Sequence, residues 1–281
     1  MKVLLTGATG FVGRHLVPTL RSRGHEVISL QRSLPDDGRH PWLQGVQVHE
    51  FDLQFPDRVD PDHLRADALV HLGWAGLPDY RSSVHREINF PASLKLIELV
   101  LGAGVKQLMV TGTCLEYGLA EGCLDEDMSV SPELPYAVAK DELRKQADEL
   151  AQKASANLLW LRLFYMYGVG QNPTSLLASL DSSIDQQADC FNMSGGEQLR
   201  DYAPVEWVAA QMVRMLELSG VAGVFNCCSG RGVTVKQIVE QRLKERGASI
   251  KLNLGVYDYP DYEPMAFWGS NLRMLRALGD A

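Results

Sequence analysis

The hydrophobic pattern of the chain alternates between short apolar runs and longer stretches with helical spacing. The stretches 11–23, 79–102 and 136–154 repeat apolar residues at the three- and four-residue intervals of an amphipathic helix. Apolar runs of strand type lie at residues 2–5, 26–30, 46–51, 68–73, 105–110, 158–164 and 224–228. Regular alternation of strands and helices predicts right-handed βαβ units in a doubly wound parallel sheet, the α/β class.

The second half of the chain is less regular. Further elements are predicted there, helices at 173–184, 205–218 and 234–246, a strand at 188–193, and a last helix ending near 279. A proline-bearing loop is expected at 119–135. We predict a dinucleotide-binding domain over 1–165, to which 203–228 returns, and a smaller α/β lobe formed by 166–202 and 229–281.

A glycine-rich turn, TGATGFVG, separates the first strand from the first helix. Its glycines are Gly7, Gly10 and Gly13, a GxxGxxG spacing one residue longer than GxGxxG. Glycine lets the backbone turn sharply and approach a pyrophosphate, and the N–H groups and dipole at a helix start favour its negative charge. Dinucleotide binding is therefore favoured over an ordinary tight turn.

The ends of the next strands bear on the choice of dinucleotide. NAD-binding units carry an acidic residue about 20 positions after the glycines, where this chain has Arg32-Ser33. A guanidinium and a hydroxyl both donate to a 2′-phosphate, which predicts NADP(H) rather than NAD(H); a solvated arginine is the alternative. Asp52 either accepts from the adenine amino group or caps its strand, and Gly73 leaves room for a cofactor. His71, within an apolar run, is interpreted as a core histidine.

Tyr136 and Lys140 lie four residues apart at a helix start and so share one face. The tyrosine phenol has an ordinary pKa near 10, and both a nearby ammonium and an oxidised nicotinamide are expected to favour the phenolate. The phenol could then exchange a proton with a substrate oxygen while hydride moves at carbon. Thr113, at the end of the preceding strand, could hold the same oxygen. The alternative is an aromatic residue packed on its helix beside a solvated lysine.

Composition excludes several classes of protein. The 281 residues are 46% apolar and carry a net charge of −8, which argues against non-specific nucleic-acid binding. No apolar run is long enough to span a membrane, and the N-terminus does not resemble a signal peptide. The five cysteines lack CxxC spacing, so we expect free thiols, no metal site and a cytoplasmic location. Cys227-Cys228 is expected in a buried strand.

The motifs together resemble the extended short-chain dehydrogenases/reductases, the family of nucleotide-sugar epimerases, dehydratases and reductases. The pieces that carry the resemblance are TGATGFVG, Asp52-Leu53, HLGWAG, Asn89, TGTCLEYG, YAVAK, LRLFYMYGVGQNP, LRDY and VFNCCSG. The resemblance implies a Rossmann domain, a nucleotide-sugar lobe, no nucleic-acid or membrane partner, and a homodimer formed through two long helices of the Rossmann domain. It assigns catalysis to Thr113, Tyr136 and Lys140.

The same resemblance implies the binding residues. Those expected at the cofactor are Gly7, Thr9, Gly10, Phe11, Val12, Gly13, Arg32, Ser33, Asp52, Leu53, Leu72, Gly73, Tyr136, Lys140 and Phe164. Those expected at the substrate are Trp74, Cys114, Leu115 and Arg200, the last for the substrate pyrophosphate. A structural pairing of Arg200 with Asp201 or another carboxylate is the alternative.

Departures from the family pattern narrow the activity. Family dehydratases follow the catalytic threonine with Asp-Glu, where this chain has Cys114 and Leu115, which argues against dehydration. Tyr165 replaces the usual asparagine, and the YEPMAFWGSN segment looks like that of 6-deoxy-4-ketosugar reductases or packs the lobe. We therefore expect NADPH-dependent reduction of the C4 keto group of a nucleotide-activated 6-deoxy-4-ketohexose, in deoxysugar or surface-polysaccharide biosynthesis. The alternatives are an NAD-dependent 4-epimerase and a non-catalytic NAD(P)-sensing protein.

Overall fold

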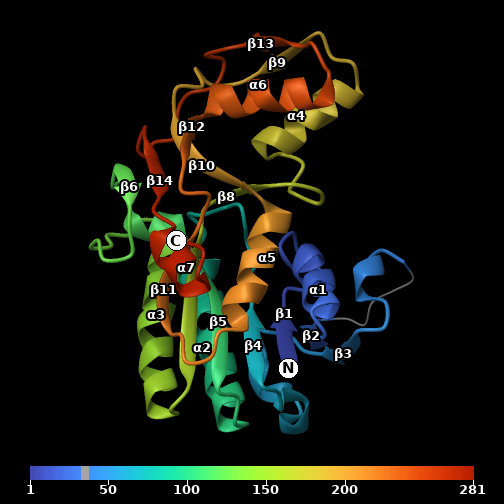
Figure 1. The fold of residues 1–281 in the computed structure, drawn as a ribbon, viewed down its shortest axis with the longest axis vertical. Helices are drawn as coiled ribbons and strands as arrows, with labels where there is room; N and C mark the ends of the chain where they lie inside the picture. Colours follow the sequence, from blue (N-terminus) through green and yellow to red (C-terminus); the bar gives the residue numbers. More distant parts are fainter. Residues whose placement is uncertain (33–37) are drawn as a thin grey trace.

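The computed structural model describes residues 1–32 and 38–281, and its core is a sheet of seven parallel strands. The strands follow the spatial order β11-β7-β5-β4-β1-β2-β3 (Figure 1). Their bounds are β1 (Lys2–Thr6), β2 (Glu26–Gln31), β3 (Gln47–Glu50), β4 (Ala68–His71), β5 (Gln107–Thr113), β7 (Asn157–Leu163) and β11 (Gly223–Cys227). The parallel α/β sheet expected from the hydrophobic pattern is confirmed, because all neighbouring strands in it pair in parallel.

Helices cover both faces of this sheet (Figure 1). On one face α1 (Gly13–Ser22), α5 (Val205–Leu216) and α7 (Leu272–Leu278) share a core with the strands. On the other face α2 (Phe90–Gly102) and α3 (Pro135–Lys153) pack side by side over a second core. The prediction that residues 229–281 belong to the smaller lobe is therefore wrong for α7, since its buried Met274 packs into the sheet core.

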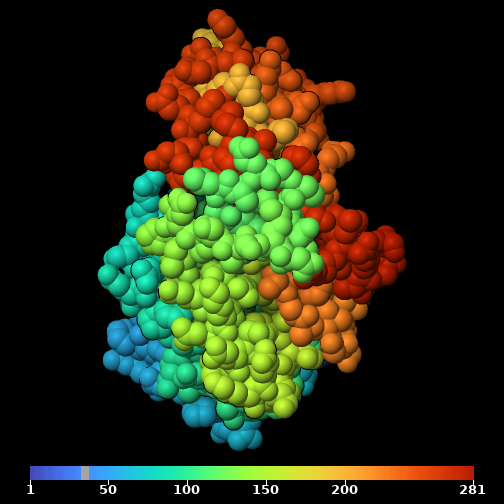
Figure 2. Space-filling view, turned by 90° about the vertical axis from the view of Figure 1, so that its left-hand side faces the viewer, coloured from blue at the N-terminus to red at the C-terminus, as the bar shows by residue number. Residues whose placement is uncertain are grey.

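The smaller lobe lies beyond the carboxyl ends of the sheet strands. Figure 2 shows it in orange and red, above the green segment of the chain. Its strands and helices are β8 (Tyr165–Tyr167), β9 (Cys190–Asn192), β10 (Leu199–Pro204), β12 (Gly232–Thr234), β13 (Lys251–Asn253), α4 (Leu176–Asp185) and α6 (Val235–Arg246). Strand β10 pairs with β8 and β12, and β9 pairs with β13. The lobe thus stands over the edge of the sheet where α/β proteins bind ligands.

Two segments differ from the predicted pattern. The helix expected from residue 79 begins only with a π-helical turn, η4 (His85–Asn89), that leads into α2. The Asp79 carboxylate accepts the Arg81 N–H at 3.2 Å, and the His85 ring lies 2.7 Å from the Asp79 carbonyl, so this stretch is a turn. The loop expected at 119–135 contains β6 (Gly122–Leu124), which pairs with β14 (Phe267–Gly269).

Short single-turn helices complete the chain. They are η1 (Pro41–Leu43), η2 (Pro56–Arg58), η3 (Pro61–Leu64) and η5 (Cys114–Tyr117). In the part of the chain that the structure describes, no helix is long and apolar enough to cross a membrane. Across the same residues no group of three or more metal-ligating side chains is found. Cys227 and Cys228 are buried free thiols, as expected.

Candidate active site at the carboxyl edge of the sheet

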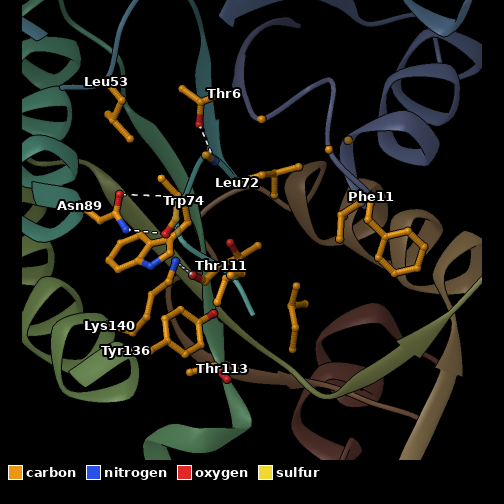
Figure 3. Close-up of a pocket in the computed structure, with 18 of the residues that line it drawn as sticks. Thr6, Phe11, Leu53, Leu72, Trp74, Asn89, Thr111, Thr113, Tyr136 and Lys140 are labelled. Atoms are coloured by element: carbon orange, nitrogen blue, oxygen red, sulfur yellow. Dashed lines mark hydrogen bonds between the residues drawn. The ribbon is translucent and has the colours of Figure 1, made fainter. Parts of the chain in front are cut away.

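A cavity of about 550 Å³ opens where the sheet meets the smaller lobe (Figure 3). Most of the predicted site residues line it: Gly7, Thr9, Gly10, Phe11, Val12, Gly13, Arg32, Asp52, Leu53, Leu72, Gly73, Trp74, Thr113, Cys114, Leu115, Tyr136, Lys140 and Phe164. Ser33 lies outside the described residues. Arg200 is absent from the described lining. Residues from the ends of six strands, β1, β2, β3, β4, β5 and β7, therefore meet at one cavity, because parallel strands finish at the same edge.

The glycine turn at one end of the cavity leaves no room for side chains. Gly7 has φ +74°, and a Cβ there would lie 2.9 Å from the Gly73 nitrogen. A Cβ on Gly13 would lie 2.2 Å from the Gly7 carbonyl oxygen, which cannot move aside because it is backbone. The described first turn of α1 also carries no acidic side chain. This cradle fits the diphosphate of a nicotinamide dinucleotide, approached by backbone N–H groups at a helix start.

A buried network beneath the turn ties it to β4. The Thr6 hydroxyl accepts the Gly73 N–H at 3.0 Å and lies 2.7 Å from His71 Nδ1. His71 Nε2 lies 2.9 Å from the Ser93 hydroxyl. Burial lowers the pKa of His71 to about 3, so the imidazole is neutral and each nitrogen has one partner. The core interpretation of His71 is confirmed, and its role is to fix the cavity floor.

Lys140 lines the cavity and is almost fully buried. Its Nζ donates to the Thr111 carbonyl at 2.7 Å and lies 3.9 Å from the centroid of the Trp74 ring (Figure 3). Burial lowers the pKa of this ammonium to about 7, and the negative charge of Glu116 acts in the opposite direction. Lys140 is thus fixed by its contacts with Thr111 and Trp74 rather than solvated, and it loses its proton more readily than an exposed lysine.

Tyr136 lies among aromatic rings beside Lys140. Its ring centroid is 5.5 Å from that of Tyr80, 6.0 Å from Trp74 and 5.2 Å from His85. Burial raises the pKa of the Tyr136 phenol above its ordinary value, and a hydrogen bond with Thr113 only partly offsets this. Burial thus acts against the expected phenolate in the unliganded protein. The combined effect of Lys140 and an oxidised nicotinamide on the phenol stays a prediction.

Thr113 ends β5 and begins η5. Its hydroxyl accepts the Leu115 N–H at 3.2 Å, and its own N–H donates to the Glu116 carboxylate at 2.9 Å. Cys114 and Leu115, which follow it, belong to a buried apolar cluster that also holds Tyr136. Burial raises the pKa of the Cys114 thiol, so it stays neutral. One wall of the cavity is accordingly apolar beside a row of hydroxyl groups.

Arg200 lies behind this wall with a carboxylate partner. It is almost fully buried, and its Nη2 pairs with Glu263 at 2.9 Å. The Tyr165 hydroxyl donates to the same carboxylate. Asp201 accepts instead from the backbone N–H groups of Ser229 and Gly230. The structural alternative for Arg200 is thus realised, with Glu263 rather than Asp201, and Glu263 itself lines the cavity.

Several lining residues were outside the predicted site. Asn89, quoted only for the family resemblance, donates to the Ala75 carbonyl at 2.8 Å and fixes the segment after β4. Tyr80, Tyr165 and Glu263 also line the cavity. An asparagine at a helix start is a usable sequence signal. Tyr80 lies in the stretch predicted as a helix, Tyr165 begins β8 and Glu263 lies in the YEPMAFWGSN segment, and only the fold brings the three together.

The sheet, the glycine cradle and the Thr113–Tyr136–Lys140 grouping define a Rossmann-type dinucleotide-binding protein. Residues 3–228 match the model of the NAD dependent epimerase/dehydratase family, and the chain belongs to that family. The predicted resemblance is confirmed, and so is the expected dependence on a nicotinamide dinucleotide.

Individual relatives are similar over nearly the whole chain. The dTDP-6-deoxy-L-talose 4-dehydrogenase (NAD(+)) of Aggregatibacter actinomycetemcomitans is 29% identical over 274 residues, 96% of this chain and 100% of the relative. The GDP-6-deoxy-D-mannose reductase of Pseudomonas aeruginosa is 25% identical over 85% of this chain and 78% of its own. The solved structure of MoeE5 in complex with UDP-glucuronic acid and NAD has a TM-score of 0.80 and 27% identity, covering 99% of this chain and 93% of that one.

Proposed function

We propose that the protein reduces the C4 keto group of a nucleotide-activated 6-deoxyhexose with NADPH. The observation that carries the proposal is the cavity wall, where Tyr136 and Thr113 stand beside the buried apolar residues Cys114 and Leu115; burial also raises the pKa of the Tyr136 phenol. A protonated phenol is ready to give a proton to a carbonyl oxygen, the direction of reduction. The relative from Aggregatibacter is named for oxidation at the same sugar carbon, the reverse of this reaction.

The site residues divide the work of reduction between them. NADPH, when bound, would supply the hydride for the carbonyl carbon. Tyr136 donates its proton to the C4 oxygen, and the Thr113 hydroxyl holds that oxygen by a hydrogen bond. The Lys140 ammonium stabilises the phenolate that Tyr136 becomes, since an opposite charge nearby favours the ionised form.

The apolar wall supports a 6-deoxy sugar. Cys114 and Leu115 are buried apolar residues at the positions next to Thr113. A methyl group at C6 fits such a surface, whereas a hydroxyl or carboxylate there would lose hydrogen bonds with water. Neither residue can act as an acid or a base for elimination of water, because Leu115 has no titratable group and burial keeps the Cys114 thiol protonated.

The reaction is tested by mixing the purified protein with NADPH and nucleotide-activated 4-keto-6-deoxysugars, and following absorbance at 340 nm. Loss of absorbance with formation of a 4-hydroxyl product is the expected result.

An NAD-dependent 4-epimerase is the second candidate function, favoured by the NAD and UDP-glucuronic acid in the MoeE5 complex. Tightly bound NAD that co-purifies, together with no consumption of NADPH, would replace the reductase by the epimerase.

Arg32 supports the choice of NADP(H). Leu30, Gln31 and Arg32 end β2 at the cavity, and none of them is a carboxylate that could receive a ribose 2′-hydroxyl. Arg32→Asp should raise the Kd for NADPH by about 10- to 100-fold, the loss of roughly one charge-assisted hydrogen bond plus repulsion, and leave NADH nearly unchanged. The check is fluorescence titration of both dinucleotides, and equal losses for the two would exclude a 2′-phosphate contact.

Arg200 is proposed to contact the substrate diphosphate, and segments 166–202 and 229–271 to hold the nucleotide. In this structure Glu263 stands between Arg200 and the cavity, so a diphosphate must displace that carboxylate to reach the guanidinium. Arg200→Met should raise KM for the nucleotide sugar by about tenfold or more and leave dinucleotide affinity unchanged. Steady-state kinetics on the variant measures this, and an unchanged KM would make Arg200 a purely structural partner of Glu263.

A further inference from the structure

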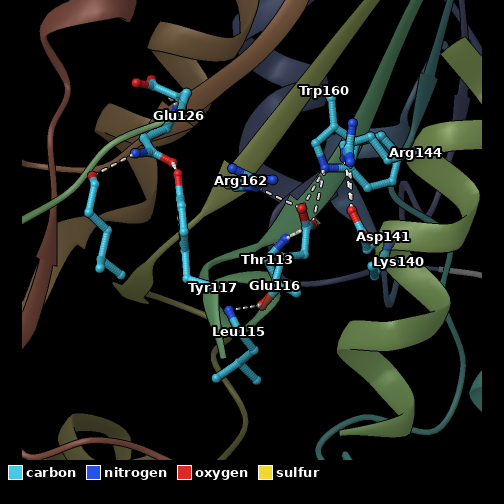
Figure 4. Close-up of polar contacts among 12 residues, drawn as sticks. Thr113, Leu115, Glu116, Tyr117, Glu126, Lys140, Asp141, Arg144, Trp160 and Arg162 are labelled. Carbon is cyan, nitrogen blue, oxygen red and sulfur yellow. Dashed lines mark hydrogen bonds and ion pairs between the residues drawn. The ribbon is translucent and has the colours of Figure 1, made fainter. Parts of the chain in front are cut away.

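Glu116 is a fully buried carboxylate just outside the cavity, three residues after Thr113. Its Oε1 accepts the backbone N–H of Thr113 at 2.9 Å and the indole N–H of Trp160 at 3.1 Å. Its Oε2 accepts Arg162 Nε at 2.7 Å (Figure 4). A carboxylate in an apolar core is costly unless it is paired and hydrogen-bonded, and every contact of this one holds the strand ends β5 and β7 together.

The network is packed tightly against the backbone that carries Thr113. A Cβ on Gly112 would lie 2.2 Å from Trp160 Nε1 and 2.4 Å from Glu116 Oε1. Thr113 is also the N-cap of η5, in a capping box completed by Glu116. The Thr113 hydroxyl is therefore placed by a side chain that itself does not line the described cavity. A shift of that hydroxyl would change its distance to the substrate oxygen.

Glu116 also supplies negative charge to the catalytic pair. Other titratable side chains near Tyr136 and Lys140 or in the same cavity include His71, Tyr80, His85, Cys114, Asp141, Arg162, Tyr165 and Glu263, the last of which pairs with Arg200. Burial keeps the His71, Tyr80 and Cys114 side chains neutral. His85 Nδ1 accepts from the Trp74 indole and its Nε2 lies 2.7 Å from the Asp79 carbonyl, the pattern of a neutral ring.

Asp141, which is buried on α3, pairs with Arg144 at 2.7 Å and with Lys145 at 2.6 Å. Burial lowers the pKa of Lys140, and the negative charge of Glu116 raises it. Glu116 also contributes to the raised pKa of Tyr136. Both effects favour the protonated forms of Lys140 and Tyr136, which reduction requires.

We propose that Glu116, held by Arg162 and Trp160, is a positioning residue that fixes Thr113 and provides the negative charge facing Tyr136 and Lys140. The inference rests on the proposed ketoreductase function for its kinetic readout. It assigns to Glu116 a role in the reaction without contact with substrate or cofactor.

The test is Glu116→Gln, which keeps the shape and one acceptor oxygen but removes the charge. We expect kcat to fall by about 10- to 100-fold, the size of effect that misplacement of a reacting group produces, with little change in KM. We also expect the alkaline limb of the pH profile to move down by roughly one pH unit, because Lys140 loses its favourable neighbour.

Glu126→Gln is the matched control. Glu126 is also nearly buried, accepts a backbone N–H from Asn226 at 2.8 Å and pairs with Arg273, but it lies on the far side of Tyr117 (Figure 4). Its replacement should leave kcat and the pH profile unchanged. Equal losses in the two variants, or a Glu116→Gln variant with normal kcat and pH profile, would overturn the inference.

Two further measurements keep the test decisive. If Glu116→Gln fails to fold because Arg162 loses its partner, the double variant Glu116→Gln/Arg162→Met removes both charges and should fold, with the loss of kcat retained. A double variant with restored kcat would overturn the inference.

The second measurement is titration of Lys140 by NMR of 13C-lysine-labelled protein, with the signal assigned by comparison with Lys140→Met. It needs no sugar substrate. A lowered Lys140 pKa in Glu116→Gln is expected even if the proposed reaction is wrong, and an unchanged one would contradict the charge role.

Discussion

Tyr136→Phe is expected to lower kcat for ketosugar reduction by about 10²- to 10⁴-fold, the usual contribution of a positioned general acid. Phenylalanine keeps the ring that packs against Tyr80, Trp74 and His85 and removes only the hydroxyl. The fold and the affinity for NADPH should therefore remain near those of the native chain. Single-turnover oxidation of NADPH at 340 nm measures the chemical step, and dinucleotide titration measures binding separately.

Tyr117→Phe is the matched control for this variant. Tyr117 belongs to the same apolar cluster as Tyr136, and its hydroxyl donates to Asn226 at 2.8 Å, away from the cavity. Loss of that buried hydrogen bond should cost about 1 kcal/mol of unfolding free energy and leave kcat unchanged. A Tyr136→Phe enzyme that retained more than a tenth of the native kcat would show that another group, or water, delivers the proton.

Lys140→Met is the second substitution with a large expected effect. It should change the pH dependence of stability and the catalytic rate in ways that can be measured separately. Burial lowers the pKa of Lys140 to about 7 from an ordinary value of 10.5, so the folded protein disfavours the charged lysine. Below pH 7 the lysine is protonated in both the folded and unfolded states, and the full penalty of the buried charge is present. Between pH 7 and 10.5 the unfolded chain binds more protons, so native stability rises with pH, at up to about 1.4 kcal/mol per pH unit.

The methionine variant lacks this titration. The unfolding free energy of the variant minus that of the native protein should be largest at or below pH 7. This difference should decrease as the pH rises toward 10.5, because only the native protein gains stability there. The lost hydrogen bond to Thr111 adds a nearly constant cost, so the slope with pH carries the prediction rather than the offset. Urea unfolding of both proteins at pH 6 to 10 measures it. Parallel stability curves would mean that Lys140 keeps its ordinary pKa.

The same variant should lose most of its activity at every pH. Lys140 is the cation available to the phenolate formed at Tyr136, and methionine cannot stabilise that charge. In the native enzyme the rate of reduction should fall as pH rises through the pKa of Lys140, near 7 in the unliganded protein. A pH profile of kcat/KM tests this, and a rate that increases from pH 7 to 9 would contradict the requirement for a protonated lysine.

Local sequence features predicted much of the fold and the site. The strand and helix periodicity placed the seven sheet strands. It began the helix that contains α2 too early, at residue 79. The glycine turn and the strand ends placed Gly7, Thr113, Tyr136 and Lys140 around one cavity. The placement of these strands and residues could be predicted because it depends on short-range geometry and on the rule that parallel strands end at one edge.

Other features depend on contacts between distant segments. The pairing of β6 with β14 joins residues 122–124 to 267–269, and neither strand is long enough to show a period. Glu116 meets Arg162 across 46 positions, and Arg200 meets Glu263 across 63. A charge on its own does not reveal its partner, so these buried pairs could not be assigned from spacing.

The sequence by itself determined the chemistry at the cavity: a glycine cradle, a phenol, an ammonium and a hydroxyl at fixed positions along the chain. The tertiary structure decided the state of those groups. Rings and strands from across the chain remove water from both groups, and this burial raises the pKa of Tyr136 and lowers that of Lys140, which the four-residue spacing did not reveal. Spacing shows which groups meet, whereas burial, a property of the whole fold, sets where their protons reside.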